Sequence, residues 1–215
     1  MSTGPIRVAL ADDQGIVRGG LAALLRLESD LEVVGEAATC ADTLAMVERE
    51  RPDVLLLDVQ MPAGEGAGSR PAPSDGLEVA ARLHERPGAP RIIVLTTFGR
   101  AGYLRRTLET GASGFMVKDA PVEQLIDAIR RVHQGLRVVD PELAAQSLAA
   151  GPCPLSPKEA EVLRAAALGG STADVAARVF LSEGTVRNHI SSAIGKLGVT
   201  NRAEAVRAAT DNGWL

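Results

Sequence analysis

Short apolar runs alternate with amphipathic stretches over the first 135 residues of the chain. The apolar runs predict strands over 6–10, 31–37, 54–57, 91–95 and 114–117. Apolar positions three and four apart predict helices over 15–27, 41–50, 75–83, 103–110 and 121–133. The side chains of the first helix expected to face the core are Val17, Leu21, Leu24 and Leu25. Five strand–helix units predict an α/β fold with a doubly wound, five-stranded parallel sheet and any site at the carboxyl ends of its strands.

The pattern changes after Gly135. Residues 144–150 are rich in alanine, and Gly151-Pro152-Cys153-Pro154 interrupts any helix. Beyond this point no strand pattern occurs, and short helices are expected to begin at the N-caps Ser156, Ser171 or Thr172, Ser182 and Asn201. Pro157 and the capping-box partner Glu159 strengthen the first of these starts. We therefore expect a first domain over 1–135, a linker over 136–154 and a small all-α domain over 155–215.

Composition and charge narrow the possible functions. Hydrophobic residues make up 46% of the chain and charged residues 23%, which is typical of a globular protein. Aromatic residues are only 2%, too few for an RNA-stacking surface. No apolar run is long enough to span a membrane, and the first residues do not resemble a secretory signal, so we expect a cytoplasmic protein without a membrane partner. Cys40 and Cys153 are expected to be free thiols, because their spacing fits no metal site.

The net charge of −4 is unevenly distributed. Residues 1–155 carry 16 basic and 21 acidic side chains, whereas residues 156–215 carry 7 basic and 6 acidic ones. Any nucleic-acid binding is therefore expected to use a local basic face of the second domain.

Polar side chains with complementary chemistry lie at the ends of four expected strands. Asp12 and Asp13 follow the first strand, Asp58 follows the third, Thr96 the fourth and Lys118 the fifth. Parallel strands bring such positions to one edge of a sheet. Carboxylate oxygens suit Mg²⁺, and a metal together with a lysine would neutralise a phosphoryl group attacked by a carboxylate. The sequence therefore predicts a phosphoryl-transfer pocket with Mg²⁺ as its cofactor.

The segments around these residues resemble the receiver domain of two-component response regulators. The matching segments are Ala11-Asp12-Asp13, Leu57-Asp58-Val59-Gln60-Met61-Pro62, Leu95-Thr96-Thr97 and Gly111-Ala112-Ser113-Gly114-Phe115-Met116-Val117-Lys118-Asp119. The resemblance implies that Asp58 accepts phosphate from a sensor histidine kinase. It also implies that Mg²⁺ is held by Asp12, Asp13, Asp58 and the Gln60 backbone carbonyl. Thr96 and Lys118 would bind the phosphoryl oxygens, and Phe115 would be the switch aromatic, with a plain core role as the alternative.

The connection after Pro62 departs from the family pattern. Receivers usually have two residues before an Asp-Gly pair, whereas twelve residues, Ala63 to Ser74, precede Asp75-Gly76 here. The run Gly64-Glu65-Gly66-Ala67-Gly68 is not followed directly by a helix and has no phosphate-binding lysine, so we do not expect a nucleotide-binding loop. We expect a surface insertion beside Asp58, with a role in kinase choice or phosphate lifetime left open.

The second domain contains the pattern of a helix-turn-helix. Stretches 172–179 and 182–197 are separated by Phe180-Leu181, and the apolar side of the second comprises Val186, Ile190, Ile194 and Leu197. On the other faces, Arg187 can contact guanine and Asn188 adenine, while Thr185 and Lys196 suit phosphates. The segment from Leu181 to Ile190 resembles the LuxR-type recognition helix. That resemblance implies base contacts by Arg187, Asn188 and Ser191, and phosphate contacts by Lys196 and Arg202.

Over nearly its whole length the chain is similar to response regulators of the NarL/FixJ (LuxR-type) class, in the branch that contains the desaturase regulator. The similarity implies a transcription factor, not an enzyme, that forms a homodimer on phosphorylation, binds double-stranded DNA and takes no small-molecule ligand. One alternative is a phosphatase with an aspartyl intermediate, but such enzymes usually carry Asp-x-Asp after the first strand. A sensor of acyl ligands is the other alternative, and it would need an aromatic-lined cavity.

Overall fold

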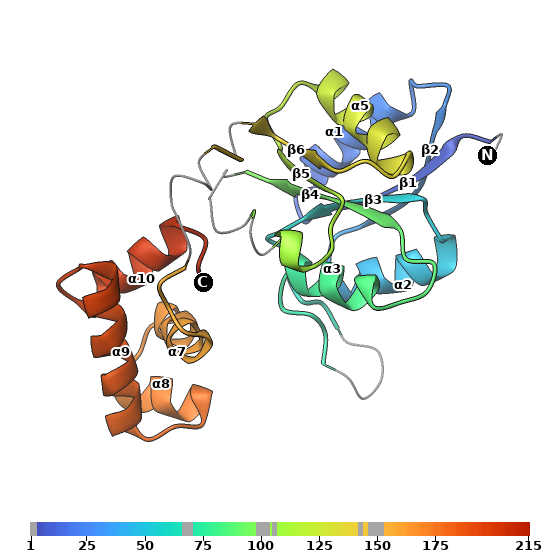
Figure 1. Ribbon diagram of the computed structural model, residues 1–215. Coiled ribbons are helices and arrows are strands. Elements are labelled where there is room, and N and C mark those ends of the chain that lie inside the picture. The colour runs from blue at the N-terminus through green and yellow to red at the C-terminus, as the bar shows by residue number, and fades with distance from the viewer. Residues whose placement is uncertain (1–3, 66–70, 98–103, 105–106, 142–143, 146–152) are drawn as a thin grey trace. The chain divides into compact units, whose positions relative to one another are not determined.

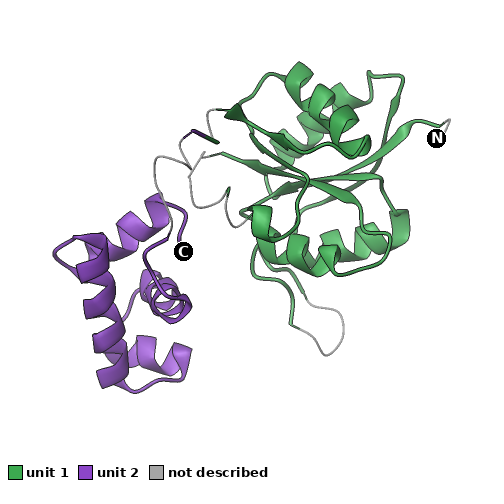
Figure 2. Cartoon of the chain, in the orientation of Figure 1, with its two compact units in different colours: residues 1–99, 104–144 green, residues 100–103, 145–215 purple. Residues whose placement is uncertain are grey.

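The computed structural model describes residues 4–65, 71–97, 104, 107–141, 144–145 and 153–215. The chain divides into two compact units, one of residues 1–99 and 104–144 and the other of residues 100–103 and 145–215 (Figure 2). Of the helix predicted over 103–110, residues 104 and 107–109 are helical, and Tyr103 and residues 105–106 lie outside the described residues. Most of the predicted alanine-rich stretch, residues 146–150, also lies outside them.

One parallel sheet forms the centre of the first unit, with strand order β2-β1-β3-β4-β5-β6 (Figure 1). Its strands are β1 (Ile6–Ala11), β2 (Leu31–Ala37), β3 (Val54–Asp58), β4 (Arg91–Thr96), β5 (Gly114–Val117) and β6 (Val138–Val139). The prediction of five strands was wrong by one, because β6 was missed. A strand of two residues has no recognisable periodicity, and β6 is defined only by its pairing with Gly114 and Phe115 of β5.

Helices cover both faces of this sheet (Figure 1). On one face lie α1 (Gly15–Leu25) and α5 (Val122–His133), and on the other lie α2 (Cys40–Glu50) and α3 (Gly76–His84). Every side chain of β3 is buried, as expected for a central parallel strand. Helix α1 ends two residues earlier than predicted, and Leu24 is exposed, because Ala22 and Leu25 occupy its inner face.

Helices are the only regular secondary structure among the described residues of the second unit. It contains α7 (Pro157–Ala167), α8 (Thr172–Val179), α9 (Glu183–Leu197) and α10 (Arg202–Asp211). Each helix begins at its predicted N-cap, whose side chain accepts a hydrogen bond from the backbone N–H three residues later. Val186 and Ile190 are buried, and Ile194 and Leu197 pack against the core, which confirms the predicted apolar side of α9.

Two further predictions concern the whole chain. Cys40 and Cys153 are free, as expected. Among the described residues, no helix combines the length and the apolar character needed to cross a bilayer.

Candidate functional site

The parallel sheet brings the predicted pocket residues to one edge. Asp12 directly follows β1, Asp58 ends β3, Thr96 ends β4, and Lys118 directly follows β5. Asp12, Asp58 and Thr96 are 3–4% exposed, which is unusual for polar side chains. The predicted convergence of these groups therefore exists in the folded chain.

Lys118 lies between two buried carboxylates. Its Nζ is 2.7 Å from Asp12 Oδ2 and 2.9 Å from Asp58 Oδ2. Although burial lowers the pKa of Lys118, its contacts with Asp12 and Asp58 raise it above the ordinary value, so the lysine stays positively charged. The pKa of Asp58 is raised, because loss of water outweighs the favourable contacts with Lys118 and the Gln60 backbone.

Three carboxylates of this pocket fit a divalent cation. One oxygen from each of Asp12, Asp13 and Asp58 lies within 4.8 Å of the other two. Asp13 is exposed, whereas the other two are buried. Asp12 Oδ2 pairs with Lys118 but, among the described residues, accepts no hydrogen bond of good geometry. A close group of hard oxygen donors with spare acceptor capacity is what Mg²⁺ binds.

The start of α3 packs directly on the end of β3. The N–H of Gly76 donates to the carbonyl of Val59 at 2.9 Å. A Cβ at Gly76 would lie 1.9 Å from the Asp58 carbonyl oxygen, so a side chain there is excluded. The Asp-Gly pair of the sequence therefore has two local roles: Asp75 caps α3, and Gly76 permits its approach to Asp58.

Phe115 points into the core of the first unit. Its side chain is 1% exposed, and its backbone lies in β5 between Val94 of β4 and Val139 of β6. This inward position fits both a switch aromatic and a plain core residue, so the switch role of Phe115 stays a prediction.

Helix α9 presents the predicted base-reading residues to solvent. Arg187, Asn188 and Ser191 are exposed, while Val186 and Ile190 on the opposite side are buried. Within the part of the chain that the structure describes, no ion pair holds Arg187. Thr185 is half-buried, and its hydroxyl lies 2.8 Å from that of the N-cap Ser182.

Lys196 has a partner that sequence reasoning missed. Its Nζ donates to Glu159 Oε2 at 2.7 Å, and Ser192 Oγ donates to Glu159 Oε1 at the same distance. Glu159 also accepts from the Ser156 backbone N–H at 2.6 Å, and its side chain is largely buried. Despite burial, the contacts with Lys196, Ser156 and Ser192 lower the pKa of Glu159 to about 2. A buried carboxylate thus joins α7 to α9, and its capping-box role alone gave no signal of this.

Arg202 is also bound within the second unit. Its guanidinium donates to the carbonyl of Ala166 at 3.0 Å and to that of Gly170 at 3.1 Å. Arg178 donates similarly to the carbonyls of Ala165 and Gly169. Both arginines therefore bind carbonyls at the negative end of the α7 dipole. The phosphate contacts predicted for Lys196 and Arg202 would have to share these side chains with structural partners.

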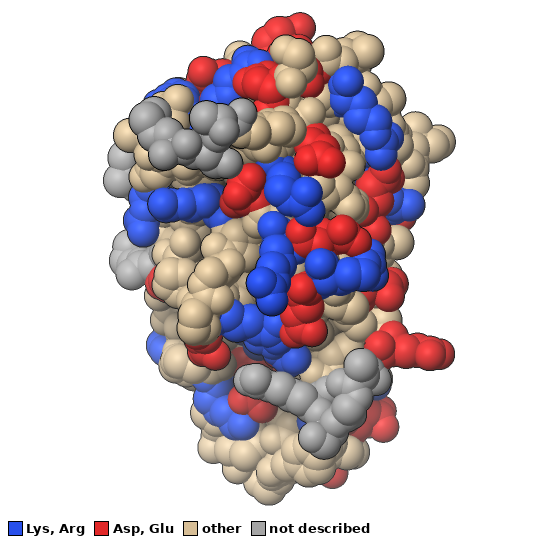
Figure 3. Space-filling view, turned by 90° about the vertical axis from the view of Figure 1, so that its right-hand side faces the viewer, with Lys and Arg blue, Asp and Glu red and all other residues tan. Residues whose placement is uncertain are grey.

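Basic and acidic side chains are interleaved on the face of the molecule drawn in Figure 3. The first unit contains several ion pairs between exposed or partly exposed side chains, including Arg7–Glu32, Arg26–Glu36 and Arg86–Glu48. On the face drawn in Figure 3, no extended area carries charge of one sign.

The chain resembles known proteins over almost its whole length. Residues 8–130 match the family described as response regulator receiver domain, and residues 153–209 match bacterial regulatory proteins of the luxR family. Two relatives come from Bacillus subtilis (strain 168): the uncharacterized transcriptional regulatory protein YvfU is 40% identical, and the transcriptional regulatory protein DesR is 39% identical. Each alignment covers 98% of this chain, with 100% of YvfU and 99% of DesR.

Solved structures extend the similarity to complexes with DNA. The structure of the two-component response regulator RcsB–DNA complex is 26% identical with a TM-score of 0.66, covering 97% of this chain and 99% of that chain. A structure of two RcsB dimers bound to two parallel DNAs has a TM-score of 0.65 at the same identity and coverage.

Proposed function

Because the chain belongs to the response regulators that join a receiver domain to a LuxR-type DNA-binding domain, we propose that phosphorylation of Asp58 controls its binding to DNA. The resemblance inferred from the sequence is thereby confirmed, including the branch of DesR. The family consists of transcription regulators, not enzymes, so the phosphatase alternative is set aside. We keep 1–135, 136–154 and 155–215 as the proposed receiver, linker and DNA-binding segments, with the difference that β6 (Val138–Val139), which lies in the predicted linker, belongs to the sheet of the first unit.

The observation that carries the proposal is the position of Lys118 between Asp12 and Asp58. An oxygen of Asp58 would attack the phosphorus of a phosphohistidine, the bond from phosphorus to the histidine nitrogen would break, and an acyl phosphate would form. Lys118 and Thr96 are proposed to bind the phosphoryl oxygens. Lys118 would then lose one carboxylate partner and gain a phosphoryl partner, and the additional negative charge of the phosphoryl group is the charge that Mg²⁺ would offset.

Asp12, Asp13, Asp58 and the Gln60 carbonyl are proposed to hold Mg²⁺. When bound, the metal would neutralise charge on the incoming phosphoryl group. The grouped carboxylate oxygens and the spare acceptor capacity of Asp12 support this proposal.

The donor of phosphate is proposed to be a sensor histidine kinase, and small acyl phosphates offer a test that needs no knowledge of that kinase. Incubation with acetyl phosphate and Mg²⁺ is expected to give one phosphate per chain, which phosphate-affinity electrophoresis and mass spectrometry detect. Asp58→Ala should abolish this uptake without unfolding the protein. Asp127→Ala, a control at an exposed carboxylate of α5, should leave it unchanged. Undiminished phosphate on the Asp58 variant would refute the assignment.

For DNA, we propose that α9 enters the major groove with Arg187, Asn188 and Ser191 at the bases. Thr185, Lys196 and Arg202 are proposed near phosphates, with the structural partners described above. The base contacts are supported by the exposure of Arg187, Asn188 and Ser191. They are also supported by the guanidinium of Arg187, which has no ion-pair partner among the described residues.

We further propose that phosphorylation yields a homodimer in the cytoplasm, where chromosomal DNA is accessible. RcsB dimers on DNA support a dimeric arrangement. Two α9 helices would then contact half-sites about one helical turn apart. Selection of binding sequences from a random duplex pool, with and without acetyl phosphate, tests this: phosphorylated protein should enrich paired half-sites, and equal enrichment without phosphate would contradict it.

A further inference from the structure

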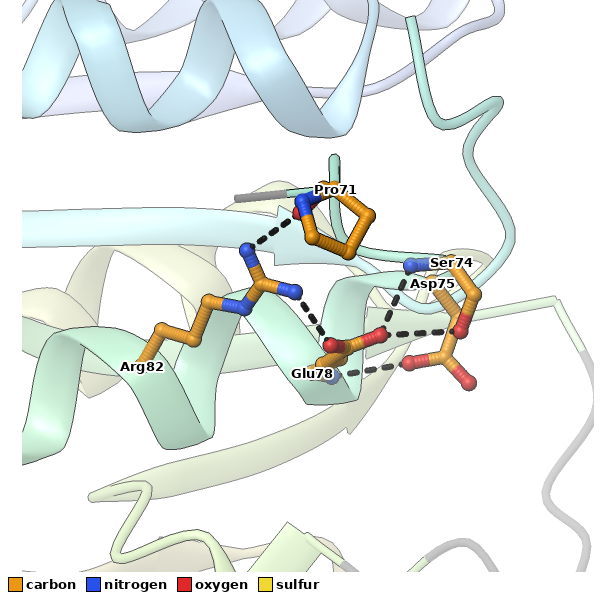
Figure 4. Close-up of polar contacts among 5 residues, drawn as sticks. All are labelled: Pro71, Ser74, Asp75, Glu78 and Arg82. Atoms are coloured by element: carbon orange, nitrogen blue, oxygen red, sulfur yellow. Dashed lines mark hydrogen bonds and ion pairs between the residues drawn. The ribbon is translucent and has the colours of Figure 1, made fainter. Parts of the chain in front are cut away.

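The inserted segment, Ala63–Ser74, lengthens the connection between β3 and α3, and hydrogen bonds hold it to α2 at its beginning and to α3 at its end. At its beginning, the carbonyls of Pro62 and Ala63 accept hydrogen bonds from the N–H groups of Cys40 at 2.9 Å and Ala41 at 3.0 Å. At its end, the carbonyl of Pro71 accepts a hydrogen bond from Arg82 of α3 at 2.8 Å (Figure 4). Only residues 64–70 separate these two attachments.

The attachment to α3 is a connected group of four residues, Pro71, Ser74, Glu78 and Arg82, which we call the α3 clamp (Figure 4). One nitrogen of Arg82 binds Pro71 and another lies 2.5 Å from Glu78 Oε1. The other oxygen of Glu78 accepts hydrogen bonds from the Ser74 backbone N–H at 2.8 Å and the Ser74 hydroxyl at 3.0 Å. The side chain of Arg82 is only 13% exposed.

An ion pair between residues four apart on a helix ordinarily stabilises only that helix, and by little. Here both members also bind backbone outside the helix, at Pro71 and at Ser74. Partial burial raises the pKa of Glu78, but the hydrogen bonds from Ser74 and Arg82 together hold it below its ordinary value. Glu78 therefore remains an ionised partner for Arg82 at neutral pH.

The clamp is connected to the proposed phosphoacceptor, Asp58, through the first turn of α3. Glu78 is in the first turn of α3, and its N–H donates to the N-cap Asp75 at 2.8 Å. The next residue, Gly76, donates to the Val59 carbonyl and touches the backbone of Asp58 so closely that no Cβ fits. A displacement of this first turn would therefore move the backbone that carries Asp58 and Gln60.

We propose that the α3 clamp keeps the position of Asp58 independent of the conformation of residues 64–70. It does so by holding the end of the inserted segment, residues 71–74, against α3. The freedom of a loop grows with the number of residues between its fixed points, and the contact at Pro71 removes 71–74 from that number. Arg82 is then a positioning residue for the reaction at Asp58 and does not touch the phosphoryl group. The inference rests on the proposed function, since it concerns phosphorylation of Asp58.

The test combines Arg82→Ala with removal of the segment. Four proteins are compared: the full chain, its Arg82→Ala variant, a shortened chain with Ala-Gly in place of residues 63–74, and the shortened chain with Arg82→Ala. The rate of phosphorylation by acetyl phosphate is measured against Mg²⁺ concentration. In the full chain, Arg82→Ala is expected to raise the Mg²⁺ concentration for half-maximal rate about threefold, whereas in the shortened chain the change should stay below about 1.5-fold.

Two variants guard against a general loss of structure. Arg86→Ala removes an ion pair with Glu48 of α2 that does not involve the segment, and it should leave both measurements unchanged. Glu78→Gln keeps the side-chain shape and weakens the clamp, so it should shift the Mg²⁺ dependence in the same direction as Arg82→Ala. Thermal melting of every variant shows that folding is retained.

Equal effects of Arg82→Ala in the full and shortened chains would overturn the proposal, because Arg82 would then act on α3 alone. Absence of an effect in the full chain would overturn it too. If neither unsubstituted chain takes up phosphate, the proposed function itself fails, and that result is recognisable before any substitution is made.

Discussion

Each unit of the chain buries a carboxylate beside a lysine, and the two pairs differ in their surroundings. In the first unit, Lys118 is shared between Asp12 and Asp58, and the side chains of all three are 4–6% exposed. In the second unit, the buried Glu159 faces a lysine, Lys196, whose side chain is 40% exposed. Burial raises the pKa of Asp58, whereas burial is outweighed at Glu159 and its pKa falls to about 2.

The difference separates a pocket that can take a further ligand from a completed structural contact. Glu159 has its oxygens occupied by Lys196, Ser192 and Ser156, so removing it breaks a connection between two helices. The pocket around Asp58 places two carboxylates on one ammonium and leaves acceptor capacity on Asp12. Incompletely satisfied buried charge is costly for folding and is found where a protein binds or transfers charged groups.

The largest expected effect is on the completed contact. Glu159→Ala should lower the free energy of unfolding of the second unit by about 3 kcal/mol, because it removes a buried ion-pair partner and leaves the Ser156 N–H without its acceptor. Urea unfolding followed by fluorescence of Trp214, the one tryptophan of the chain, reports on this unit. Glu161→Ala, at the exposed pair with Lys158, should cost less than about 0.5 kcal/mol. Similar costs for the two variants would contradict the comparison.

A slightly smaller effect is expected in DNA binding. Arg187→Ala should cost about 2 kcal/mol on a cognate duplex and flatten discrimination at one base pair. If Lys196 contacts a phosphate, Lys196→Met should lower the slope of log K against log salt concentration by roughly one per subunit. If Lys196 acts through its pairing with Glu159 instead, the variant should bind DNA more weakly with a nearly unchanged slope. Titrations at several salt concentrations, on cognate and scrambled duplexes, separate the two roles. A changed base preference in the Lys196 variant alone would refute this docking of α9.

The pH dependence of stability should have opposite signs in the two units. The pKa of Asp58 is raised from 3.8, so its ionisation opposes folding and stability is lost as pH rises through the raised value. Asp58→Asn should therefore stabilise the first unit at pH 7, and the gain should disappear as pH falls below the ordinary aspartate value of 3.8. Glu159, lowered from 4.5 to about 2, stabilises above pH 4.5 and loses this contribution as pH falls toward 2.

Calorimetry without Mg²⁺, with Trp214 fluorescence to identify the transition of the second unit, measures both trends in one protein. Destabilisation of the first unit by Asp58→Asn at neutral pH would show that Asp58 is as fully satisfied as Glu159.

The smallest effect is expected from the inserted segment. Replacing residues 63–74 by two residues should change the half-life of phosphorylated Asp58 by less than about twofold, since tenfold corresponds to ~1.4 kcal/mol of barrier. This follows if the pocket owes its properties to Asp12, Asp58 and Lys118. Decay of the phosphate, measured by phosphate-affinity electrophoresis after removal of acetyl phosphate, provides the test. A larger change would make the segment regulatory.

The sequence by itself determined most of the elements and the identity of the pocket residues. N-caps such as Ser156 and Ser182 act on N–H groups within one helical turn, so their effect is readable in the local sequence. Apolar runs such as β3 are readable for the same reason. The pocket was predictable because parallel topology requires strand ends to share one edge, which places Asp12, Asp58 and Lys118 together without knowledge of distances.

Only the tertiary structure decided which distant groups meet. The strand β6 exists through its pairing with β5, and Leu24 faces solvent because the helix packs on Ala22 and Leu25. Glu159 already had a complete local role as a capping-box residue, and its contact with Lys196 depends on how α7 packs against α9. In the sequence, Arg82 is recognisable only as a residue of a helix, and its hydrogen bond to the Pro71 carbonyl depends on the path of the chain in the folded protein. Local patterns record interactions within a turn or a strand, whereas these contacts depend on the orientation of elements that packing alone fixes.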